Sequence, residues 1–329
     1  MTHLFATDDK FADVVAELER RGWRRLPFVG CPKFDLKWTN YTKIAWTRVK
    51  PQQIVNHLHH SILFSQKDQF TELLYTHAVD QLQVDRCFPR TFDWSRPQDQ
   101  RLLKCWFLYS EAVAVLQKSL KSTMATDQVE VAMEVARTLI SDNFFERWRK
   151  EAEILEELRL RDQQFNALGS NNVWICKPSN LSQGRGIMLC SSMEELVEIT
   201  SPGEQGGQLE AEFSSSLTKW IIQKYIERPL LLQNGRKFDI RQWVLITELE
   251  PKPTAFWFYR SYLRFCSRKF DLTCLHDRFT HLSNYSVQQH FAPHQSTEID
   301  QLGSDVPGSI PRDQLDAMWN SEQFRESLR

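Results

Sequence analysis

Lys177 ends an apolar, strand-like run, and a polar loop with two glycines follows it. The run VWICKP covers residues 173–178, and the loop SNLSQGRGI places glycines at positions 184 and 186. The lysine, Arg185 and the backbone N–H groups of such a loop can together hold phosphate. The loop fits neither GxxxxGK[ST] nor GxGxxG, so an ordinary glycine hairpin is the alternative interpretation.

A second segment, WIIQKYIERP at residues 220–229, offers backbone groups to a flat ring. A strand that emerges at Gln223–Ile226 can present consecutive N–H and C=O groups to the edge of an adenine, as a hinge that lines a nucleotide slot does. The alternative is a buried strand from which Lys224 points outward.

The segment RKFDIRQW, residues 236–243, places three ionisable side chains on one face of a strand. Side chains alternate along a strand, so Lys237, Asp239 and Arg241 share a face while Phe238 and Ile240 share the other. The two cations can bind a phosphate and a substrate carboxylate, and the aspartate can orient them or contact a ribose or an amino group. The alternative is an exposed face with a cross-strand salt bridge.

Two later segments add polar groups. In FWFYRSYLRF, residues 256–265, Arg264 follows a turn after an aromatic strand, which suits a bidentate grip on a carboxylate. In HLSNYSV, residues 281–287, Ser283 and Asn284 offer short polar side chains at a strand or loop edge. Each cluster alone is a weak sign of a nucleotide site. Together, in this order along the chain, the clusters are a strong one.

Composition limits the classes of function. The chain has 329 residues, 41 basic against 42 acidic side chains and a net charge of −1, so nothing global indicates a nucleic-acid partner. Its 7 cysteines form no CxxC pair, which favours free thiols in a reducing compartment. The N-terminus lacks a signal-peptide core, and no apolar run approaches the about 18–20 residues that span a bilayer. We therefore expect a cytoplasmic chain with no membrane insertion.

The first half of the chain is predicted to be mainly helical. Residues 9–21 form an amphipathic helix that Gly22 ends, and residues 23–29 and 34–39 have strand patterns. A short helix is expected after Pro51, and it spreads the histidines at 57, 59 and 60 around its surface, which favours a surface role over a metal site. Further helices are expected at residues 101–118, 125–140 and 141–161.

The second half is predicted to alternate strands with a few helices. Strands are expected at residues 173–176, 187–190, 219–226, 238–247 and 254–260, a helix at 193–200, a mobile loop at 201–216 and a terminal helix at QLDAMW, residues 314–319.

Taken in order, these segments resemble the tubulin–tyrosine ligase-like family, whose members have an ATP-grasp fold. The matching segments are WICKP, SQGRGI, QKYIERPLL, GRKFDIRQWVLIT, FYRSYLRF and HLSNYSVQ, which together cover residues 173–290. Upstream, FDLKWTN, PQQIVNH and RCFPRTFDW look most like the glycylating branch of that family. The expected fold class is α+β or α/β and ATP-grasp-like, with an N-terminal helical and mixed domain at 1–120, a central domain at 121–225 and an incomplete C-terminal part at 226–329.

The resemblance implies a role for each matching position. The implied nucleotide-binding residues are Lys177, Gln183 and Gly184 at the triphosphate, Gln223, Lys224, Tyr225 and Ile226 around the adenine, Lys237 and Asp239 at nucleotide and amino acid, and Ser283 and Asn284 near the phosphates. The implied catalytic residues are Arg241 and Arg264, which hold the incoming carboxylate.

The implied activity is an ATP-dependent ligase that adds glycine to glutamate side chains of tubulin C-terminal tails. An acceptor carboxylate attacks the γ-phosphate of ATP, and the amine of free glycine then displaces phosphate from the acyl phosphate. The implied setting is the cytoskeleton, with the axoneme of a cilium or flagellum among the alternatives. A tubulin glutamylase or tyrosine-ligase type of relative is an alternative assignment.

The sequence departs from this family in one respect. The family holds Mg²⁺ with an Asp and then a Glu and an Asn in a late E-x-N run, and this chain ends at SEQFRESLR without such a run. We therefore expect the Mg²⁺ ligands beyond residue 329. A truncated or degenerate, non-catalytic form that binds tubulin or nucleotide is the second hypothesis.

Overall fold

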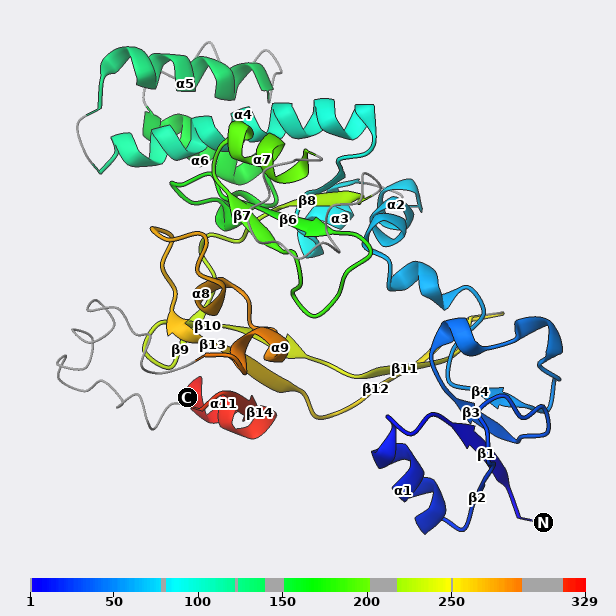
Figure 1. Ribbon diagram of the computed structural model, residues 1–329. Helices are drawn as coiled ribbons and strands as arrows, with labels where there is room; N and C mark the ends of the chain where they lie inside the picture. Colours follow the sequence, from blue (N-terminus) through cyan, green and yellow to red (C-terminus); the bar gives the residue numbers. More distant parts are fainter. Residues whose placement is uncertain are drawn as a thin grey trace. The chain divides into compact units, whose positions relative to one another are not determined.

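The computed structural model describes residues 2–77, 81–121, 124–139, 151–201, 218–249, 251–291 and 316–329 (Figure 1). The chain divides into two compact units, one made of Met1–Gln66 with Val244–Phe256 and the other of Lys67–Trp243 with Trp257–Arg329. The three-domain division with boundaries near residues 120 and 225 stays a prediction. Across the ranges described, no helix has the length and apolar character needed to cross a membrane.

The first unit contains a small parallel sheet with strand order β2-β1-β3-β4. Its strands are β1 (Leu4–Thr7), β2 (Arg24–Arg25), β3 (Leu36–Trp38) and β4 (Ile54–Val55). The predicted first helix is confirmed as α1 (Ala12–Arg20), and Gly22 follows it with φ +80°. Short 3-10 turns lie at Tyr41–Lys43, Trp46–Arg48 and Ser61–Phe64.

The helix predicted after Pro51 is wrong. Backbone pairing with β3 decides this segment, since the N–H of Ile54 donates to Asp35 O at 2.8 Å and that of Asn56 donates to Lys37 O at 3.1 Å. The segment therefore becomes the edge strand β4 followed by turns. The histidines at 57, 59 and 60 consequently do not spread around a helix.

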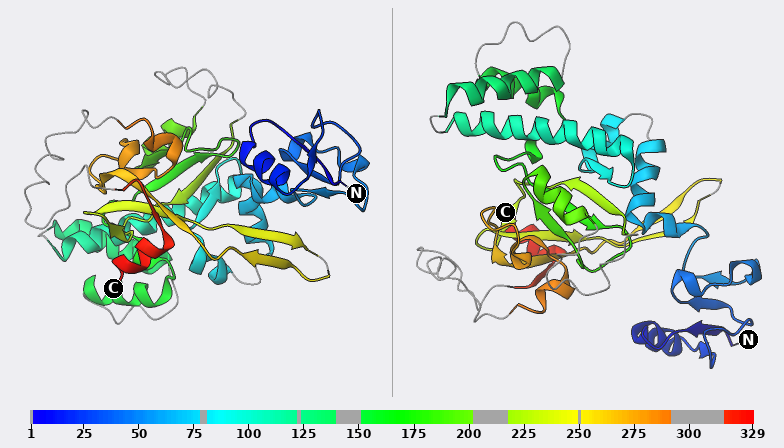
Figure 2. Two further views of the ribbon diagram at one scale, coloured as in Figure 1. Left: turned by 90° about the horizontal axis from the view of Figure 1, so that it is seen from below. Right: turned by 45° about the horizontal axis from the view of Figure 1, so that its top comes forward.

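The second unit begins with helices. They are α2 (Lys67–His77), α3 (Gln81–Cys87), α4 (Pro97–Ser119), α5 (Thr126–Leu139) and α6 (Glu151–Arg161), with a 3-10 turn at Phe165–Ala167. Helices α4 and α5 lie side by side (Figures 1 and 2). Leu116, Ile154 and Leu158 are fully buried among α4, α5 and α6. The predicted helices at 101–118 and 125–140 are thus confirmed.

An antiparallel sheet with strand order β5-β8-β6-β7 forms the centre of this unit. Its strands are β5 (Thr91–Asp93), β8 (Trp220–Lys224), β6 (Trp174–Pro178) and β7 (Met188–Cys190), and α7 (Met193–Thr200) follows β7. The alternation along β6 buries both faces. Trp174 and Cys176 pack with α4 and α7, while Ile175 packs with Leu282 and Val287 on the other side.

A second antiparallel sheet has strand order β14-β13-β10-β9. Its strands are β9 (Leu231–Leu232), β10 (Arg236–Arg241), β13 (Tyr262–Lys269) and β14 (Met318–Asn320). The helices α8 (Arg278–His281), α9 (Tyr285–Gln288) and α11 (Ser321–Ser327) complete this region, and β11 (Val244–Glu248) pairs separately with β12 (Thr254–Trp257). Helices and sheets thus combine in a mixed α/β architecture, and the predicted class is confirmed.

Two predicted elements of this region are wrong in detail. The strand expected over 238–247 is divided between β10 and β11, which pair with different partners. The helix expected at QLDAMW begins only at Ser321, because Met318 and Trp319 pair with β13 and the Trp319 ring packs 5.1 Å from Phe265. Asn320 then caps α11 with a capping box.

Some predictions fall outside the described residues. These are the helix start at 141–150, the loop at 202–216 and residues 314 and 315 of QLDAMW.

Candidate functional site

Three lysine ammonium groups from separate elements meet near the end of β6. They belong to Lys177 at that end, Lys67 at the start of α2 and Lys237 in β10. Burial, together with the positive charges of Lys67 and Lys237, lowers the pKa of Lys177 to about 8. Burial also lowers the pKa of both other lysines. Positive charges that lower the pKa of a buried lysine in this way favour a negatively charged ligand.

Lys67 is a functional candidate that the sequence did not indicate. Its Nζ donates to Pro178 O at 2.8 Å and to Leu181 O, so it ties α2 to the start of the glycine loop. Next to it, Asp68 accepts from Ser179 Oγ at 2.5 Å. No local pattern could have found Lys67, because a lysine at the first position of a helix is unremarkable by itself.

The side chain of Gln223 faces Lys177. Lys177 Nζ donates to Gln223 Oε1 at 2.5 Å. The orientation of this amide is fixed because Thr91 Oγ1 donates to Pro89 O at 2.6 Å and therefore accepts from Gln223 Nε2 at 2.7 Å. Gln223 thus fixes one hydrogen bond of Lys177, and the predicted contact of its backbone with an adenine stays a prediction.

The glycine loop is held against the segment that follows α8. Gln183 and Gly184 have φ angles of +63° and +79°. The carbonyl of Gln183 accepts from Ser286 Oγ at 2.6 Å. A Cβ at Gly184 would lie 3.0 Å from Asn284 Oδ1. The structure therefore brings the predicted loop residues together with Asn284 and, beside it, the buried Ser283.

The residues predicted to frame an adenine have different surroundings. Lys224 is buried, and its Nζ donates to Glu227 Oε1 and Val173 O, both at 2.7 Å. The alternative in which Lys224 points outward is therefore wrong. The N–H of Tyr225 donates to Val173 O at 3.2 Å, while Ile226 is 43% exposed. That this hinge contacts an adenine stays a prediction.

Lys237 is held by two acceptors. Its Nζ donates to Tyr225 Oη at 2.9 Å and to His281 O at 2.8 Å. His281, which the sequence did not single out, is also hydrogen-bonded to Tyr225 through its ring. The predicted lysine and the predicted hinge therefore meet through a tyrosine hydroxyl.

Asp239 pairs with both predicted carboxylate-binding arginines. Arg264 donates to it through Nε at 2.9 Å and Nη2 at 2.6 Å, and Arg241 Nη2 lies 3.1 Å from its Oδ2. Asp239 and Arg264 are direct partners in the β10–β13 register, so the cross-strand salt bridge is the arrangement present here. The Arg264 side chain is 14% exposed and that of Arg241 is 44% exposed.

Metal-binding side chains do not gather into a cluster among the described residues. No group of three or more His, Cys, Asp or Glu side chains capable of holding a metal occurs among them. Asp239 lies near Lys237 and is bound by two arginines, while Asp68 lies near Lys67 and pairs with Lys219. At ATP sites Mg²⁺ is held by one or two carboxylates together with phosphate oxygens and waters.

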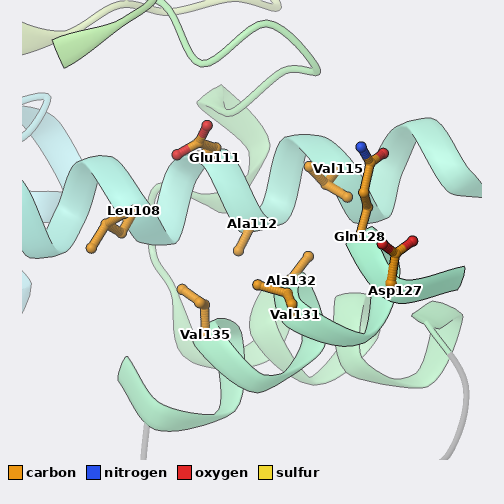
Figure 3. Close-up of a pocket in the computed structure, with 9 residues that line it drawn as sticks. All are labelled: Leu108, Glu111, Ala112, Val115, Asp127, Gln128, Val131, Ala132 and Val135. Carbon is orange, nitrogen blue, oxygen red and sulfur yellow. The ribbon is translucent and has the colours of Figure 1, made fainter. Parts of the chain in front are cut away.

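A separate cavity of about 510 Å³ lies between α4 and α5 (Figure 3). It shares no residue with the lysine cluster. Its lining residues are Leu108, Glu111, Ala112, Val115, Asp127, Gln128, Val131, Ala132 and Val135.

Comparison with known proteins finds similar sequences in one family. The Tubulin-tyrosine ligase family matches residues 103–307, which is more than half of the chain. Tubulin monoglycylase TTLL3 of Homo sapiens is 37% identical over 181 residues, covering 54% of this chain and 20% of the relative. Tubulin glycylase 3D of Tetrahymena thermophila is 24% identical over 414 residues, covering 92% of this chain and 38% of the relative.

Protein monoglycylase TTLL8 of Homo sapiens is 35% identical over 190 residues, covering 57% of this chain and 19% of the relative. The chain therefore spans about a fifth of the length of the human relatives. The family match includes the glycine loop, the hinge, β10, β13 and the segment with Ser283 and Asn284. From this match we conclude that the chain belongs to the tubulin-tyrosine ligase family.

Proposed function

We propose that this chain is part of an ATP-dependent ligase that adds glycine to glutamate side chains of tubulin C-terminal tails. Family membership supports a ligase, and the relatives named tubulin monoglycylase or tubulin glycylase support glycine and tubulin as substrates. The single structural observation that carries the proposal is the cluster of Lys67, Lys177 and Lys237, since three adjacent ammonium groups suit a triphosphate. A cytoskeletal location is part of the same proposal.

In this proposal the chain binds ATP with the lysine cluster and the glycine loop. The lysines contact the phosphates, and so do the backbone of Gln183 and Gly184 and the side chains of Ser283 and Asn284. The hinge at Gln223–Ile226 lies against the adenine. The positive φ angles at residues 183 and 184 support the loop's role because they mark a tight turn, and the N–H groups of turns can bind anions.

The lysines also supply the electrostatics of the reaction. The acceptor carboxylate attacks the γ-phosphorus of ATP and ADP leaves, which gives an acyl phosphate. The amine of glycine then attacks the acyl carbon, loses a proton and displaces inorganic phosphate. Negative charge is spread over the transferred phosphoryl oxygens, where positioned cations stabilise it. Arg241 and Arg264 are the candidates for binding the carboxylate of free glycine. This carboxylate would replace Asp239 as the acceptor of their hydrogen bonds.

Mass spectrometry of tubulin peptides tests the activity. Incubation of tubulin with the protein, ATP and a mixture of glycine, glutamate and tyrosine is expected to add glycyl residues to glutamates of the tails. The Lys177→Met variant is expected to lose this product. Added glutamate or tyrosine in place of glycine would reject the glycylating assignment while retaining the ligase class.

A second candidate function is nucleotide or tubulin binding without turnover. The observation that favours it is the absence of a carboxylate cluster for Mg²⁺ among the described residues. Titration calorimetry with ATP, with and without Mg²⁺, separates the two candidates. Tight metal-dependent ATP binding together with addition of glycine to tubulin contradicts the non-catalytic form, and sedimentation with polymerised tubulin tests the partner.

A further inference from the structure

Lys237, Tyr225 and His281 form a directional chain of hydrogen bonds. Lys237 Nζ donates to Tyr225 Oη at 2.9 Å, and Tyr225 Oη lies 3.0 Å from His281 Nδ1. On the other side of the imidazole, His281 Nε2 lies 3.0 Å from Cys274 O. The three side chains come from β10, the residue after β8 and the end of α8.

Chemistry fixes the direction of every hydrogen in this chain. A carbonyl oxygen only accepts, so the contact to Cys274 O requires a hydrogen on His281 Nε2. In a neutral imidazole the other nitrogen, Nδ1, is then an acceptor, and Tyr225 O–H donates to it. A lone pair of Tyr225 Oη remains to accept from Lys237.

Burial keeps both ring groups in the required protonation state. Tyr225 is 4% exposed and His281 1% exposed. Burial raises the pKa of Tyr225, and burial together with the charge of Lys237 lowers the pKa of His281. The tyrosine therefore keeps its hydrogen and the imidazole stays neutral near neutral pH. The ring of Phe270 stacks on that of Tyr225, with 6.4 Å between the ring centroids, and covers one side of the network.

We propose that His281 is a positioning residue for nucleotide binding, acting through the Tyr225 hydroxyl to orient the ammonium of Lys237 toward a phosphate of ATP. This inference rests on the proposed function, because it takes ATP as the ligand of the lysine cluster. The two contacts of Lys237, to the Tyr225 hydroxyl and to the main-chain oxygen of His281, fix two of its three donors. The third donor then has a defined direction before the ligand arrives.

A double-mutant cycle separates this role from simple packing. Tyr225→Phe removes the hydroxyl and keeps the ring, and His281→Phe removes the acceptor nitrogen and keeps the main-chain oxygen. Each is expected to weaken ATP binding about tenfold, measured by calorimetry, since a hydrogen bond to a charged group is lost or misdirected. In a Lys237→Met background the same two substitutions are expected to change ATP affinity by less than about twofold.

Tyr109→Phe is the matched control. Tyr109 is fully buried, and its hydroxyl donates to Asp162 Oδ2 at 2.9 Å in the helical part of the same unit. This variant is expected to lower the melting temperature and leave ATP affinity unchanged. Equal losses of affinity from Tyr225→Phe with and without Lys237 would overturn the positioning role.

The tautomer of His281 gives a readout that needs neither ligand nor variant. Long-range ¹H–¹⁵N NMR of the wild-type protein is expected to show neutral His281 with its hydrogen on Nε2. A hydrogen on Nδ1, or a doubly protonated ring at neutral pH, overturns the inference. Wild-type protein that fails to bind ATP overturns the proposed function and this inference together, whereas ATP binding without coupling to Lys237 overturns this inference alone.

Discussion

At the scale of single residues, the surroundings of Lys177 disfavour its charged ammonium form. It is partly removed from water and lies near the charges of Lys67 and Lys237, and all three effects disfavour its protonated form. Such a group lowers the stability of the ligand-free protein and strengthens the attraction for an anion. Function and stability therefore respond to its removal in opposite directions.

Replacing Lys177 with methionine is expected to separate these two effects. The melting temperature of the ligand-free protein should stay equal or rise, because a repelled charge is gone. The affinity for ATP should fall by about 1.5–3 kcal/mol, the usual contribution of a hydrogen bond to a charged group. Thermal unfolding with and without ATP measures both quantities. Lys252→Met, at an exposed lysine, is the control and should change neither.

The pH dependence of ATP binding has a defined sign. The pKa of Lys177 is about 8 in the folded protein and 10.5 ordinarily, so its ammonium loses its proton as the pH rises above about 8. ATP affinity should decline from pH 7.5 to pH 9.5, and Lys177→Met should flatten this decline. Between about pH 8 and 10.5 the unfolded chain binds more protons at this position, so Lys177 makes the free energy of unfolding rise with pH. A constant affinity across that range would contradict the assignment.

Gly184 is expected to tolerate no side chain. Its φ of +79° lies in the left-handed region, where an alanine would cost about 1–2 kcal/mol of conformational free energy. An added Cβ would also lie 3.0 Å from both Asn284 Oδ1 and Val287 Cγ2. Gly235→Ala is the matched control, since Gly235 has φ +85° with open space around the added atom. Chemical denaturation should show a larger loss for Gly184→Ala, and equal losses would show that the loop moves freely away from Asn284.

At the scale of elements, successive side chains at the end of β8 have different partners, because side chains alternate between the two faces of a strand. Gln223 contacts Lys177 and Tyr225 contacts Lys237, while Lys224 between them contacts the buried Glu227. Glu227 also accepts from the N–H groups of Asn171 at 3.0 Å and Val173 at 2.9 Å. One carboxylate therefore fixes the entry to β6 and the exit from β8.

Glu227→Gln should consequently destabilise the second unit strongly. The two side chains of the ion pair are 2% and 0% exposed, and removing one partner of such a pair costs about 3–5 kcal/mol. Urea denaturation measures the loss. Glu156→Gln, which breaks an exposed pair with Arg159 on α6, should have a much smaller effect. A loss at Glu227 as small as at Glu156 would show that water replaces the carboxylate.

At the scale of the whole molecule, every candidate nucleotide-binding residue lies in the second compact unit. Lys67 is the first residue of that unit, and the glycine loop, hinge, β10, β13 and α8 follow within it. Nucleotide binding is therefore a property of the second unit in this proposal. Residues 2–66 supply no candidate contact.

Hydrogen exchange with mass spectrometry tests this assignment. ATP should slow amide exchange in β6, in the loop at 179–187, in β8 and in β10. Peptides from residues 2–66 should exchange at unchanged rates and so provide an internal control. Equal protection of both units by ATP would contradict the placement of the site.

The sequence by itself determined the elements and residues whose signals are local. The apolar run before Lys177 predicted β6, the glycines predicted the loop, and the period of two along β10 placed Asp239 on the same face as Arg241. Helix α4 and helix α5 followed from apolar spacing. The helix expected after Pro51 and the one expected at QLDAMW failed, because pairing with β3 and β13 outweighed the local pattern.

Only the tertiary structure decided which charges meet. Lys67 and His281 lie far along the chain from Lys177 and Lys237. No local pattern marks Lys67, and nothing within the HLSNYSV segment shows that His281 contacts Tyr225. The β10–β13 register places Asp239 opposite Arg264, and the packing of the second unit buries Lys224 against Glu227. The physical reason is that pKa values and hydrogen-bond partners depend on neighbours in space and on exclusion of water, and both are set when distant segments pack together.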